Sequence, residues 1–151
     1  MTTDQSIDVA IIGGGPAGYA GAIYAARANL TTTVFEQGMS GGQIASTNEV
    51  ENYPGIPLLS GAELGERFQQ HAEGLGAQVT WSMVTGIDYD ADTALFTVHY
   101  DLGDTLASSV IACMGATPRS AGFVGEDTYR GRGVSYCATC DGMFFRGKQV
   151  F

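Results

Sequence analysis

The sequence predicts an α/β fold, in which the strands of a parallel sheet alternate with helices. Residues 7–12, IDVAII, are short, β-branched and bounded by glycine, as a buried parallel strand usually is. A glycine-rich turn and a helical segment rich in small residues, YAGAIYAARAN, come directly after it. A second strand-like run, TTTVFE, then ends at Glu36. Strand, turn, helix and strand in this order predict a βαβ unit.

The segments after this unit extend it within one α/β domain. Asn29 is expected to close the first helix in a left-handed conformation. Residues 60–76 predict an amphipathic helix that opens with a capping box, Ser60 and Glu63, and QVTW after it predicts another parallel strand. A small antiparallel β excursion is predicted from three segments separated by the turns DADT and DLGD, namely residues 83–89, 94–100 and 105–112.

Composition restricts the classes of partner. The 151 residues carry a net charge of −9, which argues against nucleic acid or an anionic membrane as partner. The sequence has no run of about 18 apolar residues, and its N-terminus lacks the basic and apolar regions of a signal peptide. A cytoplasmic location is therefore expected. In a reducing compartment, three cysteines indicate chemistry or burial rather than a framework of structural disulfides.

The glycine-rich turn has the spacing of a dinucleotide-binding turn, G-x-G-x-x-G, at Gly13, Gly15 and Gly18. Gly13 is expected to make the tight turn, Gly15 to let a pyrophosphate approach the backbone, and Gly18 to let helix and strand pack closely. The N-terminus of the helix would direct free N–H groups at the phosphates. Glu36 stands at the distance along the chain where an acid can accept a hydrogen bond from a ribose hydroxyl. A merely glycine-rich turn is the alternative.

A second candidate site is the pair Cys137 and Cys140 in the stretch CATCDG. Two cysteines at this spacing can form a redox disulfide, contribute half of a zinc site, or lie buried and inert. The only other cysteine in the sequence is Cys113, and His71 and His99 are far apart, so a set of four zinc ligands is not evident. We favour the redox disulfide, because one thiolate of a C-x-x-C pair is typically stabilised enough to exchange.

Six motifs occur in an order and spacing typical of one family. They are GGGPAGYAGAIYAARANL, GGQ, VENYPG, GATPR, GRGVSYCATCDG and FFRGKQV. With them the sequence resembles the low-molecular-weight thioredoxin reductases. The resemblance implies a Rossmann-like FAD-binding domain, of which residues 1–116 would be the N-terminal part, and a pyridine-nucleotide domain with the redox disulfide, which would start at residues 117–151. A second G-x-G-x-x-G is absent, so the chain is expected to be the N-terminal piece of a longer protein, with KQVF opening a strand of the second domain.

The resemblance also implies roles for single residues. Electrons would pass from NADPH to FAD, then to the cysteine pair, then to thioredoxin, with Cys140 facing the flavin and Cys137 attacking thioredoxin. Asp141 would give a proton to a departing thiolate; the alternative is a plain charge at a helix N-terminus. An FAD site is implied at ten positions: Gly13, Gly15, Pro16, Ala17, Gly18, Glu36, Gly41, Gly42, Gln43 and Asn52. A metal site is not expected, and the full-length protein is expected to be a homodimer.

Other functions stay open at this point. Ferredoxin could replace NADPH as the donor, or oxygen could replace thioredoxin as the acceptor in an FAD-dependent dithiol oxidase, because the residues that select the donor would follow Phe151. A non-catalytic thiol-binding module of the same fold is an alternative of another class, and it would purify without yellow flavin. The family's A-T-G loop reads Cys113-Met114-Gly115 in this sequence, which changes the side chains expected near the flavin. The 151-residue chain alone is expected to be inactive as a reductase.

Overall fold

The computed structural model describes residues 6–151, apart from the side chains of Thr139 and Cys140. The chain forms two compact units, Met1–Gly115 and Ala116–Phe151. The larger first unit contains a β-sheet and two long helices, and the second contains short helical segments joined by turns.

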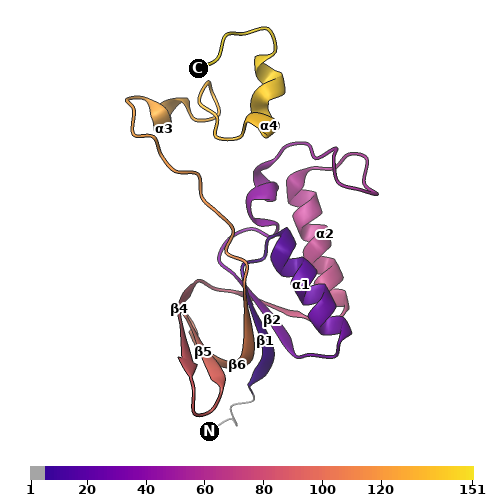
Figure 1. Ribbon diagram of the computed structural model, residues 1–151. Helices are drawn as coiled ribbons and strands as arrows, with labels where there is room; N and C mark the ends of the chain where they lie inside the picture. The colour runs from indigo at the N-terminus through magenta and orange to yellow at the C-terminus, as the bar shows by residue number, and fades with distance from the viewer. Residues whose placement is uncertain (1–5) are drawn as a thin grey trace. The chain divides into compact units, whose positions relative to one another are not determined.

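In its described part, the first unit is built on a six-stranded sheet with the order β3-β2-β1-β6-β5-β4 (Figure 1). The strands are β1 (Ile7–Ile12), β2 (Thr32–Glu36), β3 (Gln78–Trp81), β4 (Val84–Asp90), β5 (Leu95–Tyr100) and β6 (Gly103–Ala112). Strands β3, β2, β1 and β6 are parallel, whereas β5 and β4 continue from β6 as an antiparallel meander. The predicted α/β fold with its antiparallel excursion is confirmed, and β6 belongs to both parts of the sheet.

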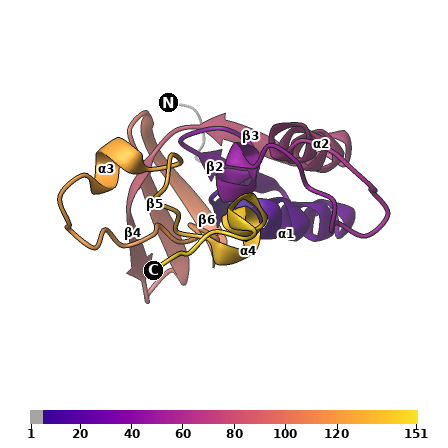
Figure 2. The same cartoon turned by 90° about the horizontal axis from the view of Figure 1, so that it is seen from above.

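Helices α1 (Pro16–Arg27) and α2 (Gly61–Gly74) pack side by side against one face of the parallel strands (Figures 1 and 2). Small residues along α1 let its backbone lie close to the sheet. The core on this face consists of Val9, Ile11, Tyr19, Ala22, Ala25, Ala26, Val34, Ala72 and Ala77.

Both helices have the predicted end signals. Asn29, just after α1, has a φ of 59°, the expected left-handed conformation. At the start of α2, the Ser60 hydroxyl accepts a hydrogen bond from the Glu63 N–H at 3.2 Å. The carboxylate of Glu63 pairs with the Arg67 guanidinium at 3.1 Å. The serine half of the capping box is therefore present, while Glu63 takes a partner one turn further along the helix.

The antiparallel meander covers the opposite face of the parallel strands. Successive residues of a strand point to opposite faces, so Ile12 and Phe35 lie on this side and pack with Val98 and Ala107. The ring centroids of Phe35 and Tyr100 are 5.1 Å apart, although β1 and β6 separate their strands in the sheet. The sheet therefore curls until β5 lies over β2. The candidate cofactor turn follows β1, the strand buried between both layers.

The second unit has three short helical segments among its described residues: α3 (Glu126–Tyr129), α4 (Ala138–Asp141) and the 3-10 helix η2 (Gly142–Phe145). An isolated bridge joins Arg130 and Val134. The expectation that KQVF opens a strand is wrong for this structure, because residues 148–151 adopt no strand. A strand is defined by hydrogen bonds to a neighbour, and no strand is present within the described part of this unit to supply them.

Candidate functional site

The glycine turn joins the end of β1 to the start of α1. Gly13 has a φ of +103°, and a Cβ on it would lie 2.4 Å from the carbonyl oxygen of Cys113. A Cβ on Gly18 would lie 1.9 Å from the carbonyl oxygen of Gly13. Both positions therefore require glycine, as expected for a tight turn and for close packing of helix and strand. Gly15 differs, because the nearest atom to a Cβ there is 4.0 Å away, so this face of the turn is open.

Glu36, at the end of β2, connects the turn to the following loop. Its side chain is buried, and its Oε2 accepts a hydrogen bond from the Gly14 N–H at 2.6 Å. Its Oε1 accepts one from the Gly38 N–H at 2.7 Å. A carboxylate offers about four lone-pair sites, so each oxygen can accept a further donor such as a ribose hydroxyl. The sequence indicated that Glu36 binds a ribose hydroxyl, and this role stays a prediction. The sequence did not indicate that Glu36 also links the glycine turn to the following loop.

The SGGQ loop lies directly against the glycine turn. The Gly41 N–H donates to the carbonyl oxygen of Gly14 at 2.8 Å. Gly41 and Gly42 have φ values of +100° and +56°, and a Cβ on Gly42 would lie 3.3 Å from the Cα of Gly15. The structure therefore brings together two segments that the sequence places about 25 residues apart.

A buried polar chain fixes this loop from the side of the two helices. Tyr19 of α1 is fully buried, and its hydroxyl is 2.9 Å from the Ser40 Oγ. Ser40 in turn donates a hydrogen bond to the Gln69 Oε1 of α2. Burial raises the pKa of the Tyr19 phenol. Sequence reasoning missed this chain; a tyrosine among small core residues signals that its hydroxyl needs a partner, but not which one.

The remaining predicted cofactor residues are exposed. Pro16 and Ala17 form the first turn of α1, and Gln43 lies in the 3-10 helix η1 (Gly42–Ser46). Asn52 lies in a loop that includes a bridge between Val50 and Leu59. Its neighbour Tyr53 lines the same groove between α1 and α2 as Pro16. Their contacts to a cofactor stay predictions.

In the second unit, Cys137 precedes the single turn of α4 and Asp141 ends it. Cys137 is half-buried and disulfide-bonded. The side chain of Cys140 lies outside the described residues, so its pairing with Cys137 stays a prediction. Asp141 is the last residue of α4, and its carboxylate makes no capping hydrogen bond to η2.

The carboxylate of Asp141 is instead bound by a residue that the sequence did not indicate. The Ser135 Oγ donates to the Asp141 Oδ2 at 2.6 Å and accepts a hydrogen bond from the Cys137 N–H at 3.2 Å. The Asp141 N–H also donates to the carbonyl oxygen of Cys137 at 3.0 Å. A serine two residues before a turn commonly bonds its own backbone, but the bond to Asp141 could not be read from that pattern.

Tyr136, between Ser135 and Cys137, is held by a buried carboxylate. Its hydroxyl donates to Glu126, and the guanidinium of Arg130 lies 4.7 Å from the centroid of its ring. Glu126 is 3% exposed. Its other donors are the Ser120 Oγ at 2.7 Å, the Ala121 N–H at 2.8 Å and the Gly122 N–H at 2.6 Å. The hydrogen bond from Tyr136, with those of Ser120 and the backbone, lowers the pKa of Glu126 to about 2.

One protein family matches the chain across both candidate sites. The model of the pyridine nucleotide-disulphide oxidoreductase family matches residues 7–150. The chain belongs to this family.

Among its relatives, the thioredoxin reductase of Bacillus subtilis (strain 168) is 41% identical over 99% of this chain and 47% of its own length. The thioredoxin reductase of Treponema pallidum (strain Nichols) is 45% identical over 99% of this chain and 48% of its own. The crystal structure of thioredoxin reductase from Streptococcus pyogenes superposes with a TM-score of 0.81 at 40% identity, covering 95% of this chain and 46% of that one. The chain thus spans about half the length of the curated relatives it matches.

These similarities confirm the resemblance drawn from the motifs, and with it the Rossmann-like fold of a pyridine nucleotide-disulphide oxidoreductase. In the described residues, no helix is both long enough and apolar enough to cross a membrane.

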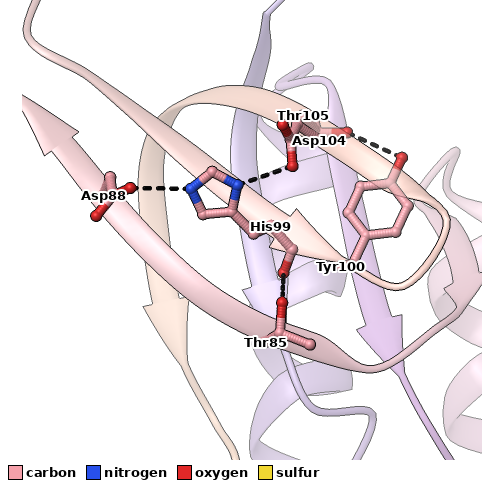
Figure 3. A network of polar contacts seen from close by, with 6 residues as sticks. All are labelled: Thr85, Asp88, His99, Tyr100, Asp104 and Thr105. Atoms are coloured by element: carbon pink, nitrogen blue, oxygen red, sulfur yellow. Dashed lines mark hydrogen bonds and ion pairs between the residues drawn. The ribbon is translucent and has the colours of Figure 1, made fainter.

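Two other singled-out residues are Cys113, whose carbonyl oxygen closes one side of the glycine turn, and His99. Cys113 is a free, half-buried thiol after β6, and burial raises its pKa. His99 lies on the meander, where its Nδ1 is 2.8 Å from the Asp104 Oδ1 and its Nε2 is 3.0 Å from the Asp88 Oδ2 (Figure 3). The hydrogen bond to Asp104 is the largest cause of the raised pKa of His99, and the hydrogen bond to Asp88 is the second. This histidine ties three neighbouring strands together.

Proposed function

We propose that the complete protein is a flavoprotein disulfide reductase that passes electrons from NADPH through FAD and the Cys137–Cys140 disulfide to thioredoxin. The observation that carries the proposal is the similarity to thioredoxin reductases along almost the whole chain, from the glycine turn to the cysteine pair. No observation favours ferredoxin as donor, oxygen as acceptor, or a non-catalytic module.

The residues around the glycine turn suit an FAD. The open face at Gly15 leaves room for a pyrophosphate beside the N-terminus of α1, where backbone N–H groups and the helix dipole favour negative charge. The free lone pairs of Glu36 can accept a ribose hydroxyl. The loop at Gly41–Gln43 and Asn52 would supply further contacts. When bound, the flavin supplies two-electron transfer between a nicotinamide and a disulfide.

In the proposed exchange, the reduced cysteine pair delivers two electrons to thioredoxin. The Cys137 thiolate attacks one sulfur of the thioredoxin disulfide, so that the S–S bond breaks, a mixed disulfide forms, and the departing thiolate takes up a proton. Cys140 then attacks the Cys137 sulfur, which re-forms their disulfide and releases thioredoxin with two thiols. Asp141 is the proposed proton donor to a departing thiolate, because its carboxylate is held beside the backbone of Cys137.

The remaining parts of the proposal concern assembly and location. We propose a cytoplasmic homodimer that recognises a protein rather than nucleic acid or a membrane. The net charge of −9 supports this choice of partner, because a strongly acidic protein repels polyanions.

Reductive titration of the complete protein tests the proposal. Under anaerobic conditions it should take up about four electrons from dithionite, two for the flavin and two for the disulfide. Beyond the amount of NADPH that reduces the flavin and the disulfide, it should oxidise NADPH only when thioredoxin is added. An uptake of two electrons, with both thiols open to alkylation beforehand, would refute the disulfide. Continued NADPH turnover without thioredoxin would refute the acceptor.

A further inference from the structure

We propose that Ser135 is a positioning residue for thiol–disulfide exchange, holding the carboxylate of Asp141 in place against the backbone of Cys137. This inference rests on the proposed function, because it assigns a third residue to the same site. It does not depend on thioredoxin being the acceptor.

The direction of each hydrogen bond follows from the chemistry of the groups. The Asp141 Oδ2 accepts both when the carboxyl group is ionised and when it carries its proton on Oδ1, so Ser135 donates its O–H to Oδ2, at 2.6 Å. The carbonyl oxygen of Cys137, at 3.4 Å, is a second and longer acceptor for this hydroxyl. A backbone N–H can only donate, so the Ser135 Oγ accepts from Cys137, at 3.2 Å. One hydroxyl therefore connects the carboxylate to the cysteine backbone. Cys137 is disulfide-bonded in this structure, so the connection is present in the oxidised state.

The bond from Ser135 to Cys137 alone would indicate no more than a local turn, which serine makes in many loops. The bond to Asp141 spans six residues and reaches the last residue of α4. It is charge-assisted, a class about twice as strong as a bond between neutral groups. It restricts the carboxylate to one orientation, which a turn does not require.

Ser135 is itself held in place by its neighbour. Tyr136 donates its hydroxyl to the buried Glu126, and its ring lies beside the guanidinium of Arg130. These two contacts limit the movement of the main chain between Ser135 and Cys137. The serine hydroxyl is therefore presented to Asp141 by a fixed backbone, which is how a positioning residue acts.

The consequence concerns the sulfur that leaves when the disulfide is opened. A thiolate attacks one sulfur, the S–S bond breaks, and the other sulfur departs with the electron pair and takes up a proton. Asp141 is the donor when its Oδ1 carries a proton; Oδ2 still accepts from Ser135, so the acid is oriented before the step and no reorientation is needed during the reaction. Without Ser135, the carboxylate of Asp141 is free to turn to solvent.

Reduction of the disulfide by dithiothreitol provides the test, in the complete protein with its flavin. The reagent loses two electrons and closes to its cyclic disulfide, and the protein gains them. Under argon, the initial rate is counted as alkylatable thiols plus bleached flavin after acid quenching. We compare the parent with Ser135→Ala, Ser135→Thr and the control Thr93→Ala, which also removes a hydroxyl bound to a carboxylate, at 2.8 Å, but in the first unit.

We expect Ser135→Ala to slow the reduction by about tenfold, the loss of one hydrogen bond to a charged group. Ser135→Thr, which keeps the hydroxyl, and Thr93→Ala should stay within about twofold of the parent. In an Asp141→Ala background, Ser135→Ala should add less than about twofold, because the two residues act together.

Three results would overturn the inference: a rate for Ser135→Ala within twofold of the parent, an equal loss in Thr93→Ala, or an undiminished loss in the Asp141→Ala background. Thioredoxin-dependent turnover of the parent is measured separately. If the parent reduces no thioredoxin while Ser135→Ala slows dithiothreitol, the proposed acceptor is wrong and the role of Ser135 stands.

Discussion

In the first unit, the residues around the glycine turn are fixed mainly by close backbone contacts, whereas in the second unit the residues around Cys137 are fixed by side chains that donate to carboxylates. Gly18 shows the first arrangement, because a Cβ there would lie 1.9 Å from a carbonyl oxygen. Glu126, with four donors, and Asp141 show the second. Steric contacts tolerate almost no added atom, whereas hydrogen bonds to carboxylates depend on charge and therefore on pH.

Gly18→Ala should produce the largest effect. The added methyl group forces α1 away from the turn, and we expect a loss of about 3 kcal/mol in the free energy of unfolding, together with loss of bound flavin. Urea unfolding and the ratio of flavin to protein absorbance measure both. Gly74→Ala is the matched control, because nothing lies within 4 Å of a Cβ there. It should be neutral or stabilising by up to about 1 kcal/mol. Equal losses in both variants would contradict the steric account.

Asp141→Asn should impair chemistry while leaving the first unit unchanged. General acid catalysis commonly contributes 10²–10⁴-fold, so we expect roughly a tenfold or greater loss of turnover with thioredoxin. The flavin spectrum and the affinity for FAD should not change, because Asp141 lies outside the unit that contains the glycine turn. Turnover within about twofold of the parent would show that Asp141 has only a structural role.

Glu36→Gln tests the carboxylate that is hydrogen-bonded to the glycine turn. The amide group keeps one acceptor but presents an N–H to either Gly14 or Gly38, whose N–H groups now donate to the carboxylate. Gly38 is exposed, so the amide N–H faces it and the oxygen stays with the buried Gly14 N–H; the loss is one hydrogen bond, about 1 kcal/mol. We expect FAD to bind roughly tenfold more weakly, measured by flavin fluorescence. Unchanged FAD affinity would show that neither the ribose contact nor the tie to the turn matters.

Acid should loosen the second unit in a manner that depends on Glu126. Its folded-state pKa is lowered from 4.5 to about 2, so its contribution is complete above pH 4.5 and is lost as the pH falls toward about 2. Hydrogen-exchange protection of the Ala121 and Gly122 amides should fall over this window, while the amides of β1 stay protected. Glu126→Gln should abolish the pH dependence. Protection that is constant down to pH 2 in the parent would contradict this account.

The two arrangements differ in how much of them the sequence reveals. Gly13 and Gly18 could be predicted because a steric requirement for glycine leaves a fixed local spacing, whereas Gly15 has an open face and its role beside a pyrophosphate stays a prediction. The polar chain that starts at Tyr19 could not be predicted, because its other members, Ser40 and Gln69, are 21 and 50 residues away from Tyr19 along the sequence, and many polar residues could occupy such positions.

In the second unit, the cysteine spacing was visible, whereas the donors to Glu126 come from residues with no shared pattern. The strand expected at KQVF failed for a related reason. A short segment becomes a strand only where another strand exchanges hydrogen bonds with it. Whether such a neighbour is present depends on the fold and cannot be read from the segment itself.

The place of β6 in the sheet also determines the order in which the site can form. β1, α1 and β2 are neighbours along the chain, but Ile7 of β1 pairs with Ala107 of β6. Such a long-range pairing forms slowly, because a large loop must close first. The carbonyl group that encloses Gly13 belongs to Cys113. On the ribosome, the nucleotide turn therefore acquires its second wall only after residue 113 has been synthesised, and until then β1 presents one unpaired edge.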